Sequence, residues 1–392
     1  MKIFFVAVVG FVAGNLDLPK SNVVVYWGQN SYGVSHLDAI QDWEKPLAHF
    51  CKDPSIDVIN ISFLNNLNDA TGQPLEINLS KHCGSVFPGT NILNCPDISN
   101  DIKECQSQNK TVLLSIGGAN ANTAFYSVEN AIKAALQTWD MFLGGTHDHR
   151  PFGTAILDGI DLDIEGGSQA FYSDFLEMLR KLFSASGRKY FVTAAPQCEF
   201  PDRNLQQIMD SAYIDAVFIQ FYNNHCGVHN YHNKASWNWG AWKDWASKKP
   251  NNSNVKLFLG VPASQSAASF GYIPPTQVLT ILADISKSPR FGGVMLWDAS
   301  QNQNNPIQGK AFSQHIQDSL TPHHPASKTT HQEYSNLFSK PTLLAQEASS
   351  QMISPTCTYL LHCFICSNQT SLFRLSQCRN CAVLAELQRK NI

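Results

Sequence analysis

The stretch LDGIDLDIEGG, from Leu157 to Gly167, decides how this chain folds. Its carboxylates Asp161, Asp163 and Glu165 alternate with apolar residues. Side chains alternate between the two faces of a β-strand, so all three acids are expected on one face. Acids crowded on one buried face repel one another, which raises the pKa of at least one of them. We therefore predict a buried strand that carries an acid able to hold a proton near neutral pH.

Further short apolar runs recur along the chain, separated by helical or loop-like sequence. Together they predict eight strands: Val23–Trp27, Asp57–Phe63, Thr111–Ile116, Leu157–Glu165, Tyr190–Ala194, Ala216–Tyr222, Lys256–Gly260 and Gly292–Trp297. Helices are expected between them, for example over Phe171–Ser184 and Pro275–Ser286. This alternation indicates an α/β fold, a (β/α)8 TIM barrel over residues 22–318. The active site of such a barrel lies at the C-terminal ends of its strands, and Glu165 ends the fourth run.

Composition and the N-terminus narrow the choice of partners and location. The chain has 392 residues, 43% of them hydrophobic, and a formal net charge of -3 with no basic run, which argues against nucleic acid. The opening MKIFFVAVVGFVAG predicts a secretory signal peptide over residues 1–14. The chain has no other long apolar segment, and a membrane span needs about 20 apolar residues. We therefore expect a protein without a membrane partner, secreted to the extracellular space or the cell wall.

The eleven cysteines fall into two groups. Six lie in the main body: Cys51, Cys83, Cys95, Cys105, Cys198 and Cys226. An even number is typical of disulfides formed in an oxidising compartment, and six cysteines allow 15 pairings. Residues 319–353 are predicted to be a linker, and residues 354–392 a small Cys-rich tail. In the tail, CFIC and CRNC are spaced as in a zinc ribbon, although disulfides are the better expectation in a secreted chain. An aberrant C-terminus is a third interpretation, and the role of the tail stays open.

The acidic motif is one of several that resemble a known family. DGIDLDIE fits the DxxDxDxE pattern of glycoside hydrolase family 18, the chitinase family. Other pieces follow in the family's order: YWGQN (26–30), SIGG (115–118), AAPQC (194–198), QFYNN (220–224) and GGVMLWD (292–298). Over roughly residues 22–318 the chain resembles the compact, hevamine-like class III chitinases of plants and fungi. The short interval between Gly260 and Gly292 leaves no room for the α+β domain inserted in larger members, so we expect a shallow cleft.

The resemblance implies a secreted endo-chitinase that hydrolyses β-1,4-linked N-acetylglucosamine polymers with retention of configuration. The nucleophile would be the N-acetyl group of the substrate itself. Glu165 would be the general acid, and Asp163 would orient the acetamide. Asp161 would share a proton with Asp163, and Tyr222 would donate its hydroxyl to the acetamide carbonyl.

The resemblance also implies how the rest of the cleft is built. Trp297 would form the floor under the sugar that is cleaved, and five more positions would line the cleft: Gln29, Asn65, Gly118, Gln220 and Asn223. The disulfides would be Cys51–Cys105, Cys83–Cys95 and Cys198–Cys226. We expect chitin and chitin oligosaccharides as partners, a monomer, and neither a metal ion nor an organic cofactor.

Two other functions remain open on the same barrel. A non-catalytic carbohydrate-binding or inhibitor protein usually lacks the counterparts of Glu165, Asp163 or Tyr222, and this chain has all three. An endo-β-N-acetylglucosaminidase that acts on glycoproteins shares the acids, but the quoted motifs taken together resemble chitinases.

Some conspicuous residues have structural interpretations. Asp158 is predicted to face away from the other acids and to serve as a structural anchor. The loop histidines His225, His229 and His232 are expected to be solvated rather than to bind metal. Tryptophans recur every third residue at 239, 242 and 245, which predicts a helix that packs on the barrel.

Overall fold

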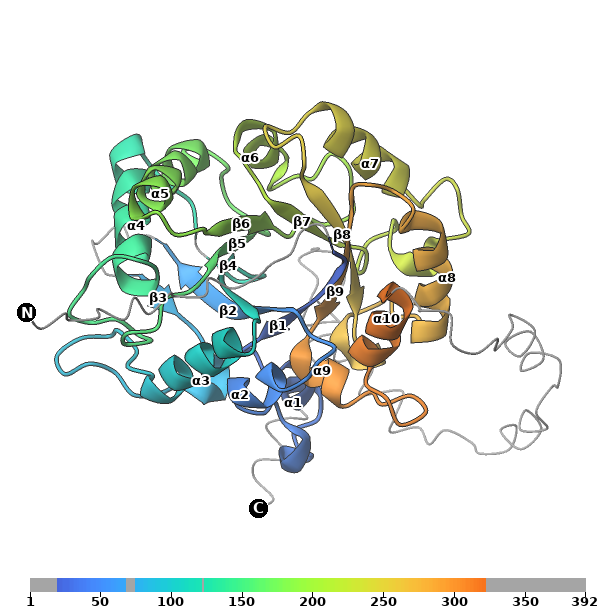
Figure 1. Cartoon of the computed structure of the whole chain (residues 1–392), viewed down its shortest axis with the longest axis horizontal. Coiled ribbons are helices and arrows are strands. Elements are labelled where there is room, and N and C mark those ends of the chain that lie inside the picture. The colour runs from blue at the N-terminus through green and yellow to red at the C-terminus, as the bar shows by residue number, and fades with distance from the viewer. Residues whose placement is uncertain (1–19, 68–74, 122, 322–392) are drawn as a thin grey trace, which may run out of the picture. The chain divides into compact units, whose positions relative to one another are not determined.

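The computed structural model describes residues 20–67, 75–121 and 123–321. The predicted signal peptide, the Cys-rich tail and the linker beyond residue 321 lie outside the described residues. The barrel that the sequence predicts falls within the described part, and Figure 1 shows its strands surrounded by helices.

Eight parallel strands form the barrel: β1 (Asn22–Trp27), β2 (Val58–Asn66), β4 (Thr111–Gly117), β5 (Gly159–Asp163), β6 (Phe191–Ala194), β7 (Ala216–Gln220), β8 (Lys256–Pro262) and β9 (Phe291–Trp297). Each strand pairs in parallel with its neighbours, and β1 closes the barrel by pairing with both β2 and β9. The predicted (β/α)8 barrel is confirmed. The sequence did not predict the short β3 (Glu76–Ile77), which pairs antiparallel with β2. Two residues are too few to show a strand's periodicity.

Ten α-helices lie in the described part of the chain: α1 (Ser31–Ser35), α2 (Leu47–Cys51), α3 (Pro96–Ser107), α4 (Val128–Phe142), α5 (Tyr172–Ser186), α6 (Gln206–Ser211), α7 (Trp239–Lys248), α8 (Pro275–Ile285), α9 (Ala299–Gln303) and α10 (Phe312–Leu320). The helices predicted over Phe171–Ser184 and Pro275–Ser286 are α5 and α8, and the helix predicted from the tryptophan spacing is α7. Pro275 begins α8, where its fixed φ and missing N–H are tolerated. None of the helices described is long and apolar enough to cross a membrane.

Alternation along the strands sorts side chains into two apolar layers. Val23 and Val25 of β1 pack in the large core that also holds buried residues of the helices, whereas Val24 belongs to a smaller cluster inside the barrel. The same alternation on β5 places Ile160 and Leu162 in the outer core. The acids between and after them therefore project into the barrel, as the period of two predicts.

Three disulfides and the buried tryptophans of α7 stabilise the elements outside the barrel strands. Cys51–Cys105, Cys83–Cys95 and Cys198–Cys226 are bonded, which are the pairs that the resemblance implied. Trp239, Trp242 and Trp245 are buried along one side of α7, as the spacing predicts. The three loop histidines are exposed.

Candidate active site

Asp161 is completely buried inside the barrel and is surrounded by hydroxyl groups. Its carboxylate accepts hydrogen bonds from Tyr26 Oη at 2.8 Å, Ser115 Oγ at 2.8 Å and Thr193 Oγ1 at 2.6 Å. These donors come from β1, β4 and β6, so three strands fix the orientation of the acid. Burial raises the pKa of Asp161, while the three hydrogen bonds act in the opposite direction.

Asp163, the last residue of β5, is also buried. Its Oδ1 accepts a hydrogen bond from Gln220 Nε2 at 2.8 Å, and the same amide nitrogen donates to the carbonyl of Ala195 at 3.0 Å. Burial, followed by the charges of Glu165 and Asp161, raises the pKa of Asp163 well above its ordinary value. The carboxyl therefore binds a proton more readily than an exposed aspartate does.

Glu165 lies just beyond the strand, which ends at Asp163 and not at Glu165 as the sequence predicted. The last register pair of β4 and β5 joins Gly117 to Asp163, and the Gly118 N–H then bonds to the Asp163 carbonyl at 2.8 Å. Released from pairing, Glu165 is only partly buried at the mouth of the barrel. Burial raises the pKa of Glu165, and Gln197 Nε2 donates to its Oε2 at 3.5 Å, which opposes that shift.

Tyr222 lies in the apolar cluster inside the barrel, close to the acids. Burial is the largest cause that raises the pKa of its hydroxyl well above the ordinary value, and the charges of Asp163 and Glu165 add to it. The hydroxyl therefore stays protonated and can donate a hydrogen bond to a ligand.

A cavity of about 400 Å³ opens beside Glu165. The residues that the sequence predicted for the cleft and that line this cavity are Gln29, Asn65, Gly118 and Trp297. They come from the ends of different strands, as expected at the C-terminal face of a barrel. The cavity thus brings the proposed acid together with four of the predicted binding residues.

Phe63 also lines the cavity, although no motif in the sequence marks it as a binding residue. Its ring stacks with that of Trp297 at a centroid distance of 6.0 Å and an interplanar angle of 20°. Gly118 has φ +88°, and a Cβ built there would lie 2.9 Å from the Phe63 ring. A glycine is therefore required at this wall of the cleft.

Two predicted binding residues do not line this cavity. Gln220 is buried and bonds to Asp163, so it contacts an acid of the site. Asn223 is exposed, and its Oδ1 accepts a hydrogen bond from the Ser269 N–H at 2.9 Å, which anchors the loop after β8. Asp158 lies outside the site, as predicted, where it pairs with Arg188 at 2.7 Å.

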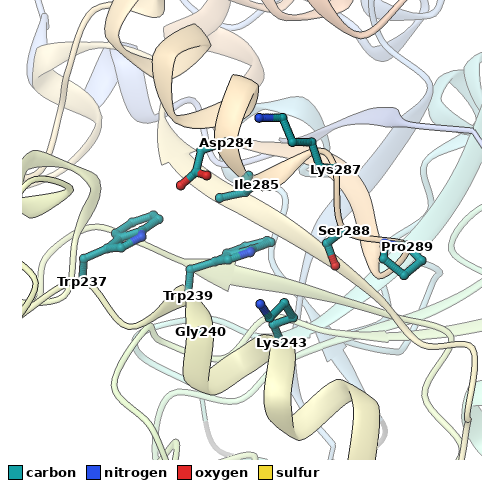
Figure 2. Close-up of a pocket in the computed structure, with 9 residues that line it drawn as sticks. All are labelled: Trp237, Trp239, Gly240, Lys243, Asp284, Ile285, Lys287, Ser288 and Pro289. Atoms are coloured by element: carbon teal, nitrogen blue, oxygen red, sulfur yellow. The ribbon is translucent and has the colours of Figure 1, made fainter.

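A second cavity, of about 450 Å³, lies between α7 and α8 (Figure 2). Trp237, Trp239 and Lys243 line it from the α7 side, and Asp284 and Lys287 from the α8 side. No residue lines both cavities. Trp237 and Trp239 therefore do not extend the cleft beside Glu165. No group of three or more His, Cys, Asp or Glu residues is placed to hold a metal ion in the part of the chain that the structure describes.

Comparison with known proteins identifies the family. Residues 22–271 match the profile of glycosyl hydrolases family 18. The chain belongs to this family. Chitinase 1 of Rhizopus niveus is 42% identical to this family 18 chain over 309 residues, which cover 78% of the chain and 59% of that protein. The chain spans about half to three fifths of the length of this protein and of two further curated relatives, Chitinase 2 of Rhizopus oligosporus and an endochitinase of Saccharomyces cerevisiae.

Solved structures agree with the assignment to family 18. A chitinase from Ipomoea carnea has a TM-score of 0.63 and 32% identity, with 76% of this chain and 100% of that chain covered. A xylanase and α-amylase inhibitor protein from Scadoxus multiflorus has a TM-score of 0.62 and 35% identity, with 76% and 98% covered.

Proposed function

We propose that this family 18 protein is an endo-acting chitinase that cleaves β-1,4 linkages between N-acetylglucosamine residues. One observation carries the proposal: Glu165 lines an open cleft while Asp163 and Asp161 stand behind it inside the barrel. A carboxylic acid with a raised pKa at the edge of a cleft is suited to protonate a leaving group. The similarity to Chitinase 1 of Rhizopus niveus supports the same substrate class.

The mechanism proposed is retaining and substrate-assisted, since family 18 is an exception to the scheme in which a second protein carboxylate attacks the sugar. Glu165 gives its proton to the glycosidic oxygen. The carbonyl oxygen of the substrate's N-acetyl group attacks the anomeric carbon as the leaving group departs, and an oxazolinium ion forms. Water then attacks the same carbon, with Glu165 as the base, and the N-acetyl group is restored.

Asp163 and Tyr222 are proposed to hold the acetamide for this attack. Gln220 occupies Oδ1 of Asp163, so Oδ2 is left to accept the acetamide N–H. The protonated Tyr222 hydroxyl donates to the acetamide oxygen. Asp161, which has three hydroxyl donors, shares a proton with Asp163, and the two acids titrate as a pair.

The sugar ring is proposed to lie on Trp297, whose stacking with Phe63 fixes the orientation of the indole. Gln29, Asn65 and Gly118 would contact neighbouring sugars along the same cleft. A shallow cleft on a barrel without an inserted domain favours cleavage inside a chain.

The test is digestion of a chitin hexasaccharide, with the products sized by mass spectrometry. Early release of di-, tri- and tetrasaccharides supports internal cleavage, whereas disaccharide and tetrasaccharide alone would indicate action from an end.

A non-catalytic inhibitor or lectin is the second candidate, because an inhibitor protein shares this fold at 35% identity. Fold similarity alone does not decide between catalysis and binding. The presence of Glu165, Asp163 and Tyr222 in one site favours catalysis. If the hexasaccharide binds but is never cleaved, the inhibitor or lectin function replaces the proposal.

We also propose that the protein is secreted and acts as a monomer. The three disulfides support an oxidising compartment. Expression in a secreting host tests both points, because a secreted monomer appears in the medium with its signal peptide removed and elutes at the mass of one chain.

A further inference from the structure

The turn after β1 carries Gln29 to the wall of the cleft. The Gln29 side chain lines the cavity, and its Nε2 donates to the carbonyls of Ser62 at 2.7 Å and Asn78 at 3.1 Å. The backbone on either side of Gln29 has positive φ, at Gly28 (123°) and Asn30 (50°). Gly28 adopts its angle without strain, whereas Asn30 lies in the left-handed region, where surrounding contacts help to hold a residue other than glycine.

Glu44 supplies those contacts. The residue is 1% exposed, and its Oε2 accepts the backbone N–H groups of Gly28 at 3.0 Å and Asn30 at 2.9 Å. In return, the Glu44 N–H donates to Asn30 Oδ1 at 2.8 Å. One buried carboxylate thus clamps both residues that flank Gln29. Glu44 Oε1 is buried without a hydrogen-bond partner among the described residues, so the acid's bonds converge on Oε2.

His82 completes the clamp from the segment before the Cys83–Cys95 disulfide. Its Nε2 lies 2.7 Å from Glu44 Oε2, and the Trp27 ring covers the imidazole at a centroid distance of 4.5 Å. Burial raises the pKa of Glu44 to about 8 and lowers that of His82 to about 4. The pair therefore holds one proton between its two facing atoms and carries no net charge near neutral pH.

Asp298 joins this turn to the end of β9, where Trp297 lines the cleft. It directly follows Trp297, and its Oδ2 accepts the Ser31 N–H at 3.4 Å. Its Oδ1 accepts from Ser300 Oγ at 2.6 Å and from the Gln301 N–H at 3.0 Å. Two buried acids therefore hold the turn: Glu44 bonds to Gly28 and Asn30, and Asp298, which follows Trp297, bonds to Ser31.

We propose that Glu44 is a positioning residue for substrate binding, which holds the Gly28–Asn30 turn so that Gln29 meets the sugar chain. Glu44 does not line the cavity itself and acts through Gln29. The proposal deepens the proposed function and rests on it for the identity of the ligand, a chitin oligosaccharide.

The test compares Glu44→Ala with Glu44→Gln on a soluble chitin oligosaccharide. Loss of the clamp should raise KM about tenfold, the effect of losing one good hydrogen bond to the ligand, with kcat changed less than about twofold. Glu44→Gln keeps an oxygen that can accept both backbone N–H groups, so its KM should stay within about threefold of the original. Glu44→Asp, which is shorter by one methylene, serves as a milder second variant if Glu44→Ala does not fold.

Asp57→Ala is the matched control. Asp57 also accepts a backbone N–H of β1, that of Val23 at 2.8 Å, but at the opposite end of the strand from Gln29. The Asp57→Ala substitution should lower the free energy of unfolding without changing KM. A KM that rises equally in Asp57→Ala, or that does not rise in folded Glu44→Ala or Glu44→Asp, would overturn the proposal.

A double-mutant cycle with Gln29→Ala separates action through Gln29 from general loosening. If Glu44 acts through Gln29, Gln29→Ala should raise KM little further in a protein that already carries Glu44→Ala. Fully additive effects of the two substitutions on KM, expressed as free energies, would contradict the proposal. The same cycle can be measured as oligosaccharide binding by calorimetry. Calorimetry distinguishes the failure of the proposed chitinase activity from the failure of the proposed role of Glu44. A protein that binds the oligosaccharide without hydrolysing it would refute the activity, and its binding would still test whether Glu44 positions Gln29.

Discussion

The Gln220 side chain donates a hydrogen bond to Asp163 at 2.8 Å, across 57 positions in the sequence. The amide nitrogen also donates to the Ala195 carbonyl at 3.0 Å, so its orientation is fixed by the end of β6. Gln220 thus fixes the orientation of the Asp163 carboxyl group, and we propose that its other oxygen, Oδ2, accepts the acetamide N–H of a substrate. This arrangement supports the proposed division of roles, in which Asp163 orients the acetamide and Glu165 protonates the leaving group.

Asp163→Asn should lower kcat on chitin oligosaccharides by about a hundredfold, since the amide cannot balance the charge of an oxazolinium ion. The loss should be smaller on activated aryl glycosides. Steady-state kinetics on both substrates check this. Asp158→Asn is the control, because Asp158 pairs with Arg188 outside the site and its loss should leave kcat unchanged. An unchanged rate of Asp163→Asn on chitin would count against substrate assistance.

Glu165→Gln should lower kcat by about a thousandfold while oligosaccharide binding stays within a few-fold of the original. The amide has the shape of the acid but cannot give up a proton. Titration calorimetry measures binding, and product release over hours measures the residual rate. Hydrolysis near the original rate would show that another group is the acid.

The same substitution should stabilise the fold at neutral pH. Burial raises the pKa of Glu165 above that of an unfolded glutamate. Its contribution to stability is therefore fully present below the unfolded pKa, near 4.3, and is lost as pH rises through the folded pKa. Glutamine avoids that loss, so the variant's Tm should exceed the original by a few degrees at about pH 8, with no difference near pH 4. A Tm difference that is the same at both pH values would contradict a raised pKa.

The sequence predicts the strands and acids of this site well because both follow the period of two. Alternation along β5 places Asp161 and Asp163 inside the barrel, and the apolar runs mark every barrel strand. Phe63 could not be distinguished in this way. An aromatic residue at the end of an apolar run looks like core, and its contact with Trp297 forms only when β2 and β9 are brought together by the fold.

Glu44 was missed for a different reason. In the segment WEKP it stands beside lysine and proline, a composition typical of an exposed loop. Its burial depends on His82 and on the turn at Gly28, which are far away in the sequence. A single sequence does not predict which charged loop residue a distant segment will cover.

The Cys198–Cys226 disulfide should matter more for activity than Cys83–Cys95. Cys198 follows Gln197, which bonds to both Glu165 and Asn224, so the bridge holds the residues around the acid. The Cys198→Ser/Cys226→Ser variant should lose about 3–4 kcal/mol of stability and show reduced kcat even where it remains folded. The Cys83→Ser/Cys95→Ser variant serves as the comparison, and its kcat should be the less affected of the two. Equal loss of kcat in both would contradict the local role.

EDTA should leave hydrolysis of chitin oligosaccharides unchanged. Every step proposed for Glu165, Asp163 and Tyr222 uses a carboxyl, a hydroxyl or the substrate's own acetamide. The assay compares initial rates before and after dialysis against the chelator. Loss of activity that added Zn²⁺ or Mg²⁺ restores would refute the metal-free mechanism.

The central claim is that Glu165 acts with the substrate's acetamide to cleave with retention of configuration. NMR of the products during the first minutes of chitin oligosaccharide hydrolysis tests it most directly, before the anomers interconvert. We expect the β-anomer to appear first. Initial release of the α-anomer would contradict it.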